Sequence, residues 1–319
     1  MIRILTLLTL VGVLSVGFAQ QLPQYSQYNF NYYIQNPAIG GLDRPVEAQL
    51  GYRTQWVGFE GEPPRTTFVS VHGPVKFNDN RNVHHRAKPH HGLGAYVFQD
   101  KAGLLTYKGL NLSYSYHMNL TRKHKLSFGT FVGFKQYTLD ASQVVFTQSP
   151  DYDPKLEGKQ ENALLPDASV GIWYYSDKLF VGLSSHQILR SSIDLSQNSV
   201  KGDFANLDYH YLLNAGRLFK INKWVKIIPS LLVKAVSPAP IQVDLTYKML
   251  FDDKYSFFLS GRNFDALIAG VSARYEMLEI GYAFDLTTNA LQQHSSGTHE
   301  IMLEVYLSPK KKVECPKFF

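Results

Sequence analysis

Length, composition and charge limit the class of this protein. The chain has 319 residues, of which 13% are aromatic and only 18% are charged, below the quarter or so that is usual in soluble domains. The formal net charge is +6, but the basic residues are scattered, so the sequence offers no clustered stripe for a nucleic-acid groove. Because Cys315 is the single cysteine, an intramolecular disulfide and a metal site built on several cysteines are excluded.

The start of the chain predicts an export signal. Residues 1–19 combine Arg3, an apolar run over residues 4–14 and the small residue Ala19 before a glutamine, an order typical of a cleaved signal peptide. The alternative is a membrane anchor, but a span needs about 20 apolar residues and this run is shorter. No later stretch has the length and apolarity of a transmembrane helix. A mature form that sits in a membrane must therefore be a β-barrel.

Residues 20–44 form a polar, aromatic segment that is too irregular for a strand and shows no helical period. Within it, Asn36-Pro37 and Gly40-Gly41 favour turns. Two interpretations remain open. The segment could plug or line a barrel or dock a periplasmic partner, or it could be an extended linker.

Apolar and polar residues alternate through much of residues 45–309, as expected for strands with one apolar face. In residues 109–119, Leu110, Leu112 and Tyr114 alternate with Asn111, Ser113 and Ser115. About fourteen such segments can be counted, near residues 45–56, 64–76, 92–100, 105–119, 124–138, 168–177, 178–187, 208–222, 225–236, 240–252, 254–263, 265–277, 278–286 and 298–308.

An even number of long strands predicts an all-β fold, a transmembrane antiparallel up-and-down β-barrel over residues 45–309. A secreted β-sandwich would show the same alternation. The barrel is favoured because the segments exceed the usual 5–6 residues and their polar faces are rich in Gly and Ser. Residues 310–319 are then expected to be a C-terminal periplasmic tail.

Loop lengths support a barrel, because outer-membrane barrels have short periplasmic turns and longer outer loops. With a periplasmic N-terminus, the short connections are predicted on the inner side near residues 119–123, 222–224, 252–253 and 277–278. The outer loops are predicted near residues 139–167, 188–207 and 287–297. The connection 77–91 falls on the inner side and is longer than this rule predicts.

Two local features add expectations. Trp56, Trp173 and Trp224 are candidates for the aromatic girdles at the membrane interfaces. Pro229 interrupts an otherwise good strand pattern and predicts a bulge or a late strand start.

Residues 84–91 contain the most conspicuous local cluster, the four histidines His84, His85, His90 and His91. Imidazole is a common ligand for zinc, copper and nickel. However, no Asp, Glu or Cys lies among them, and Arg86 and Lys88 would repel a cation. A solvated turn is therefore favoured over a metal site.

No catalytic residue and no cofactor is predicted. Ser185 and His186 are adjacent on a strand and so point to opposite faces, and no nucleophile elbow is present. Ionisable residues on the expected inner face are predicted to pair with one another across the lumen, since charges facing lipid are costly. They are Asp244, Lys248, Arg262, Arg274, Glu276, Asp285, Glu300 and Glu304.

The start of the mature chain carries a longer motif. Residues 23–28 read Pro-Gln-Tyr-Ser-Gln-Tyr, and after several aromatic residues Asn-Pro-Ala and a glycine follow. This order resembles the opening of the PorP/SprF family, outer-membrane barrels linked to the type IX secretion system and gliding motility. The residues that carry the match are Gln24, Tyr25, Ser26, Gln27, Tyr28, Asn36, Pro37, Ala38 and Gly40. Looser similarity continues at Tyr52-Arg53, Gln55-Trp56, residues 91–94, Asp100, Gly103 and residues 315–318, whereas the His-rich stretch before Gly92 departs from the family.

The resemblance implies a barrel without enzymatic activity that supports secretion and surface attachment of particular cargo, such as adhesins with a conserved C-terminal domain. Periplasmic components of the secretion machinery and outer-membrane lipid would be its other partners, and the nine motif residues become candidate partner-binding residues. The alternative from the residues alone is a transport channel of the fatty-acid-transporter or porin kind. A lipid-processing enzyme would need a Ser-His pair that faces lipid, and none is evident.

Overall fold

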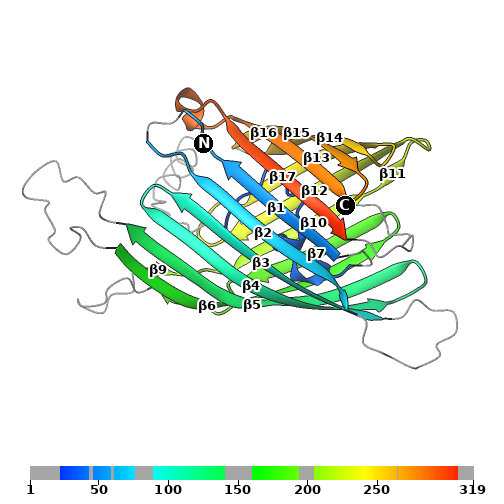
Figure 1. The fold of residues 1–319 in the computed structure, drawn as a ribbon, viewed down its shortest axis with the longest axis horizontal. Helices are drawn as coiled ribbons and strands as arrows, with labels where there is room; N and C mark the ends of the chain where they lie inside the picture. The colour runs from blue at the N-terminus through cyan, green and yellow to red at the C-terminus, as the bar shows by residue number, and fades with distance from the viewer. Residues whose placement is uncertain are drawn as a thin grey trace, which may run out of the picture.

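Fourteen antiparallel strands close into one barrel in the computed structural model, which confirms the predicted fold class (Figure 1). The structure describes residues 22–42, 46–58, 61–75, 89–140, 160–193, 205–263 and 265–307. Each strand pairs with its neighbours in the sequence, and the pairing of β1 with β17 closes the circle. This is the order of an up-and-down barrel.

The wall strands are β1 (Val46–Thr54), β2 (Arg65–Val75), β3 (His90–Ala102), β4 (Leu105–Asn119), β5 (His124–Asp140), β6 (Gln160–Ser176), β7 (Leu179–His186), β10 (His210–Arg217), continued by β11 (Phe219–Lys220), β12 (Val225–Val236), β13 (Gln242–Phe251), β14 (Tyr255–Arg262), β15 (Ala266–Tyr275), β16 (Leu278–Thr287) and β17 (Thr298–Leu307). A small ribbon of β8 (Ser192–Ile193) and β9 (Ala205–Asn206) lies between β7 and β10 in the sequence. The described helices are α2 (Tyr32–Gln35), η1 (Pro37–Ile39) and η4 (Ala290–His294), and none of them has the length and apolarity to cross a membrane.

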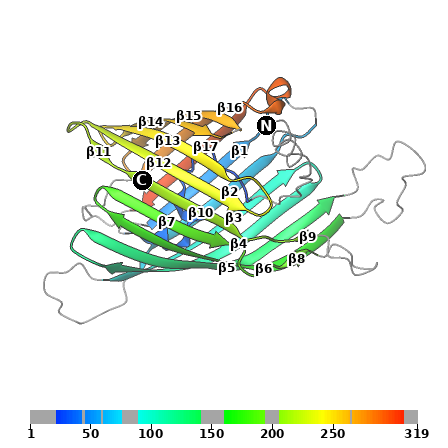
Figure 2. The same ribbon diagram turned by 180° about the vertical axis from the view of Figure 1, so that it is seen from behind.

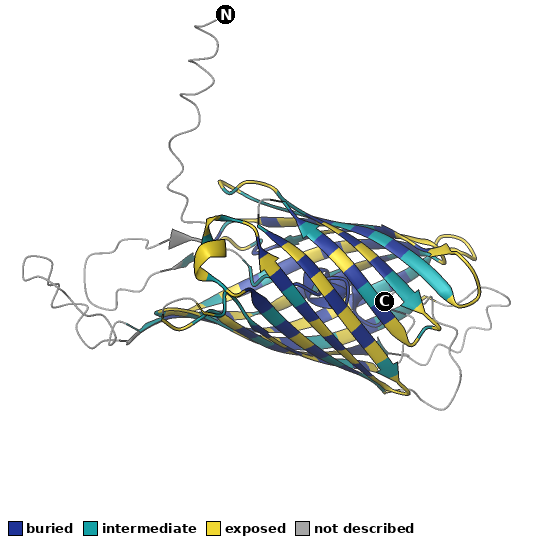
Figure 3. Ribbon diagram, turned by 90° about the horizontal axis from the view of Figure 1, so that it is seen from above, coloured by how far each residue is buried: buried dark blue, intermediate teal, exposed yellow. Residues whose placement is uncertain are grey.

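The two faces of the wall alternate as the sequence predicts, and dark blue and yellow residues alternate along the strands in Figure 3. On β4, Leu112 is 61% exposed on the outside, whereas Ser113 is 4% exposed and faces the lumen. On β5, Val132 is exposed and Phe131 is buried. An apolar outer face with a polar inner face is the arrangement of outer-membrane barrels.

Exchange of Leu112 for arginine therefore tests the outer face. Leu112 lies at the middle of β4 and pairs with Val132 across the strand boundary. An arginine at the bilayer midplane is expected to lower the free energy of unfolding from lipid vesicles by about 2–4 kcal/mol, measured by urea titration. The matched control is Leu189→Arg, because Leu189 is similarly exposed, at 51%, but lies in the connection after β7. Equal effects at both sites would show that Leu112 does not face lipid.

The two ends of the barrel differ. We call the "turn end" the one with the connections at residues 76–89, 120–123, 177–178, 221–224, 252–254 and 276–277; all of these but 76–89 are short. The "loop end" is the opposite one, with the connections at residues 55–64, 103–104, 141–159, 187–209, 237–241, 263–265 and 288–297 (Figures 1 and 2). By the rule of short periplasmic turns, the turn end is expected to face the periplasm. Exposed aromatic residues gather near it: Trp224, Phe251, Tyr255 and Tyr275.

Several local predictions need correction. Trp173 is not an interfacial residue, because it is fully buried on the inner face of β6 and stacks on Phe180. Glu276 is not in the lumen, because it lies exposed in the turn between β15 and β16 with φ 51°. Strand β6 begins at Gln160, eight residues before the predicted start, so the predicted loop 139–167 is partly strand.

The prediction at Pro229 is also wrong in its detail. Strand β12 begins at Val225, ahead of the proline, and contains no bulge. The partner strand is interrupted instead, since the β10–β12 pairing stops at Gly216↔Ser230 and resumes in the same register at Phe219↔Ile227. Because proline has no N–H group, the ladder loses a hydrogen bond opposite this gap.

Candidate functional site

The N-terminal segment lies inside the barrel. We call residues 22–42 the "lumenal segment"; all of its residues from 25 to 42 are buried. It starts at the loop end, where Gln24 donates to Gln242 at the start of β13 (3.1 Å). It ends near the turn end, where Leu42 and Glu47 of β1 line the same small pocket. The chain therefore runs the length of the lumen before it enters the wall.

A buried ionic cluster anchors the first half of the lumenal segment. Arg53 of β1 lies 3.3 Å from Asp285 and 3.5 Å from Glu300. The backbone N–H groups of Ser26 and Gln27 donate to the two oxygens of Glu300 at 2.7 and 2.9 Å. The hydroxyl of Ser26 donates to Asp285 at 2.7 Å. Hydrogen bonds to ionised groups are among the stronger ones, so the Ser-Gln pair of the motif is held firmly at this site.

A second ion pair lies beside the first. Arg262 of β14 donates from Nε and Nη2 to Asp244 of β13 at 3.1 and 3.0 Å, and both side chains are almost fully buried. The same guanidinium donates to the carbonyl oxygen of Tyr25 (3.2 Å) and to the side-chain oxygen of Gln24 (3.3 Å). Further along, the hydroxyl of Tyr28 lies 3.2 Å from that of Ser230. The residues 24–28 are thus held by the wall at every position.

The Asn-Pro-Ala part of the motif forms a short cap that lies directly against the wall glycines Gly129 and Gly171. Asn36 accepts a hydrogen bond from the N–H of Ala38 (3.0 Å) and caps η1, whose first residue is Pro37; both choices suit a helix start. Its amide nitrogen donates to the wall carbonyls of Ile172 and Leu183 at 3.1 and 3.2 Å. The side chain of Asn36 thereby uses both its donor and its acceptor.

Exchange of Asn36 for aspartate is expected to lower the free energy of unfolding by about 1–3 kcal/mol. The donor to two carbonyl oxygens would be replaced by an acceptor of nearly the same shape. Asn222 provides the control, because only its side-chain oxygen is used, in accepting from the N–H groups of Trp224 and Val225. Asn222→Asp keeps those bonds and should be neutral in the same urea titration, whereas an effect at Asn222 as large as at Asn36 would contradict the assigned roles.

Serine and histidine side chains of the wall bind carbonyl groups of the lumenal segment. Ser184 and His186 of β7 both lie within 2.8 Å of the carbonyl oxygen of Gln35. Ser115 and His117 of β4 hold the carbonyl of Gly40 in the same way. A carbonyl oxygen only accepts, so each imidazole donates from Nε2. Residues two apart share a strand face, and a Ser-x-His spacing in the sequence was the signal that could have predicted these pairs.

Aromatic stacking fills the space between these polar anchors. Tyr32 packs on Trp173 and Phe180, with ring centroids 5.7 and 5.3 Å apart. Tyr33 packs on His72 at 4.2 Å and shares a hydrogen bond of 2.7 Å with Ser113. The lumen at this level is therefore filled by side chains from the segment and the wall.

Most ionisable residues predicted for the lumen are found there. Asp244, Lys248, Arg262, Asp285, Glu300 and Glu304 are buried. Arg274 is partly exposed and donates to Glu279 of β16 at 2.6 Å. Arg53 and Glu279 are the charged partners that the sequence interpretation did not single out.

The predicted histidine cluster is divided by the fold. His90 faces the lumenal segment, with Nε2 at 3.0 Å from the carbonyl oxygen of Gly41, and stacks on His117. His91 faces outward, with Nδ1 at 2.7 Å from the hydroxyl of Tyr114. His84, His85 and Cys315 lie outside the described residues. Within the described ranges, no group of three or more His, Cys, Asp or Glu side chains is placed to hold a metal ion.

A family model of type IX secretion system membrane proteins, PorP/SprF, matches residues 17–305. The chain belongs to the PorP/SprF family. The nine motif residues of this family member all lie in the lumenal segment, and eight of them are buried. No match is found among curated proteins.

Solved structures with a similar fold are distant in sequence. A FadL homologue of Pseudomonas aeruginosa has 9% identity and a TM-score of 0.47, with 90% of this chain and 95% of the other covered. The P. putida toluene transporter TodX has 10% identity and a TM-score of 0.42, with 85% and 90% covered. A mutant Rh. blastica porin has 8% identity and a TM-score of 0.35, with 82% and 98% covered.

Proposed function

We propose that this chain is a non-enzymatic outer-membrane barrel that supports the export and surface attachment of specific type IX cargo, such as adhesins, and through them gliding motility. The observation that carries the proposal is the filled lumen. A channel needs an open path, whereas here a segment of the chain itself crosses the barrel. Ser26 of this segment donates a hydrogen bond to Asp285, and the carbonyl of Tyr25 accepts one from Arg262; Asp285 and Arg262 both belong to buried ion pairs. A filled barrel is better suited to act as a scaffold at the membrane surface.

Cargo is proposed to bind at the loop end, and periplasmic components of the secretion machinery at the turn end. The nine motif residues would support partner binding from inside the barrel without touching the partner. Their contacts to the wall fix the position of the lumenal segment at the loop end. They are candidate partner-binding residues in this indirect sense. The signal peptide, residues 1–19, is proposed to be removed before the barrel closes, since residue 22 already lies at the mouth of the lumen.

The test compares surface-bound and secreted proteins by mass spectrometry between the intact strain, a strain that lacks this chain, and the complemented strain. Selective loss of one or a few surface proteins, restored by complementation, is expected, together with reduced colony spreading. Membrane fractionation should find the chain in the outer membrane. An unchanged surface proteome with altered solute uptake would overturn the proposal and favour the transport channel.

A further inference from the structure

A cavity of about 80 Å³ lies inside the barrel near the loop end. It is bounded by the start of the lumenal segment at Leu22, by the β12–β13 connection at Ala239 and Pro240, and by the inner faces of β3, β4, β7, β10 and β12. One buried water needs roughly 10–15 Å³, so the cavity has room for a molecule larger than a single water. Its position gives it access from the side of the long loops.

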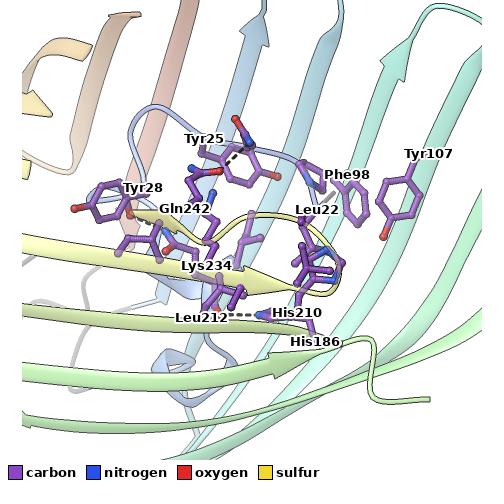
Figure 4. Close-up of a pocket in the computed structure, with 18 of the residues that line it drawn as sticks. Leu22, Tyr25, Tyr28, Phe98, Tyr107, His186, His210, Leu212, Lys234 and Gln242 are labelled. Carbon is purple, nitrogen blue, oxygen red and sulfur yellow. Dashed lines mark hydrogen bonds between the residues drawn. The ribbon is translucent and has the colours of Figure 1, made fainter. Parts of the chain in front are cut away.

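The lining is mostly apolar and aromatic. Figure 4 shows Leu22, Phe98, Leu212 and Tyr107 around the space, and Leu232 and Ile34 complete the apolar wall. A largely apolar cavity with a few polar groups is the usual form of a small-molecule site.

One cation of this lining makes no hydrogen bond or ion pair among the described residues. Lys234 of β12 points into the cavity (Figure 4), and within the described part of the chain no hydrogen bond or ion pair joins its ammonium group to another residue. Its diagonal neighbour on β13 is Asp244, but that carboxylate already accepts from Arg262 and from Gln242. An ammonium group in apolar surroundings is costly unless a counter-charge is present.

A second polar group of the lining, the side-chain amide of Gln35, has only part of its hydrogen-bonding capacity used. Gln35 is buried, and its amide nitrogen donates to the carbonyl oxygens of Tyr28 and Asn31, whereas its Oε1 has no hydrogen-bond partner. By contrast, His186 is occupied by the carbonyl of Gln35. Lys234 is thus a cation of this lining whose ammonium group is not in direct contact with a carboxylate of the described residues.

We propose that this cavity binds a small monocarboxylate with an apolar body, whose carboxylate pairs with Lys234 and whose body packs against Leu22, Phe98 and Leu232. This binding is independent of the secretion function and would give the barrel a ligand at its outer mouth. Charge-assisted hydrogen bonds fix the anionic end, and apolar burial stabilises the rest. Figure 4 places Lys234 and Tyr107 on either side of Leu22 and Phe98, so the charged end and the aromatic end are separated.

The experiment measures binding of phenylacetate, 2-phenylethanol and phenethylamine to the purified full-length barrel in nanodiscs by titration calorimetry. Saturable binding of phenylacetate is expected, with at least about tenfold weaker binding of the neutral alcohol and none of the amine. Lys234→Met should weaken phenylacetate binding by about tenfold or more, because it removes the charge and keeps the stem. Lys234→Arg keeps the positive charge and should retain phenylacetate binding. This variant tests the role of the charge if Lys234→Met does not fold.

The matched control is Lys226→Met on the same strand face at the turn end, where Lys226 already pairs with Asp253. It should leave phenylacetate binding unchanged. Equal affinity for phenylacetate and 2-phenylethanol, wild-type affinity in Lys234→Met, or no saturable phenylacetate binding would each overturn the proposal. A strain that carries Lys234→Met is expected to keep the surface proteome of the intact strain, although its barrel binds phenylacetate weakly. The ligand proposal and the secretion proposal can therefore fail independently.

Discussion

Exchange of Arg262 for methionine is expected to lower the free energy of unfolding of the barrel by about 3–5 kcal/mol. The side chain of Arg262 is 1% exposed and that of its partner Asp244 is 0% exposed. Without the guanidinium, the carboxylate would stay in the lumen without its main counter-charge, and the carbonyl of Tyr25 would lose its donor. Urea unfolding followed by the fluorescence of the buried Trp173 measures the change.

The control for this variant is Arg190→Met. Arg190 pairs with Asp208 at 3.2 Å, but the two side chains are 53% and 38% exposed. Surface ion pairs of this kind contribute at most about 1 kcal/mol. A loss at Arg262 no greater than the loss at Arg190 would contradict the view that Arg262 joins the lumenal segment to the wall.

Exchange of Gly129 for leucine is expected to expel the Asn-Pro-Ala cap from the wall. A side chain at Gly129 would collide with the backbone of Pro37 and Ala38, which cannot move without breaking the bonds of η1. Overpacking costs typically about 1–3 kcal/mol, which corresponds to roughly 5- to 150-fold in the population of the unseated segment. Hydrogen exchange of the amides of Asn36 and of residues 38–41 should accelerate accordingly.

Gly261→Leu is the matched control for this exchange. Gly261 lies on β14, and a Cβ there would meet only the end of the Leu267 side chain at 4.0 Å. Exchange rates in the lumenal segment should remain those of the unaltered chain. Similar acceleration in both variants would mean that a general weakening of the wall, and not contact with η1, releases the segment.

The barrel was predictable from the sequence because alternation of two faces is a local property. Strands such as β4 and β15 show it plainly, with leucine or valine outside and serine or glycine inside. It is obscured on β6, where Trp173 and Tyr175 face inward while Tyr174 faces outward. The inner face is aromatic there because it packs on Tyr32 of the lumenal segment. The expectation that the inner face of a barrel is polar therefore gives the wrong position for Trp173.

The candidate site was predictable only in part. The motif identified residues 24–28 and 36–40, and the interior charges Asp285 and Glu300 were recognised, but the sequence did not join the two groups. Their contacts link distant positions, as in the bond between Ser26 and Glu300, which are 274 residues apart. No local pattern encodes such a pairing. The direction of the segment, from the loop end to the turn end, likewise follows only from the closed fold.

The most direct test of the filled lumen is single-channel conductance of the purified chain in planar bilayers, with Gly129→Leu measured alongside. The unaltered barrel should insert without stable open steps, because residues 25–42 occupy its interior, and the Gly129→Leu variant should show steps when the cap is expelled. Steady, porin-like conductance of the unaltered chain would contradict the filled lumen and, with it, the proposed role as a scaffold for secretion.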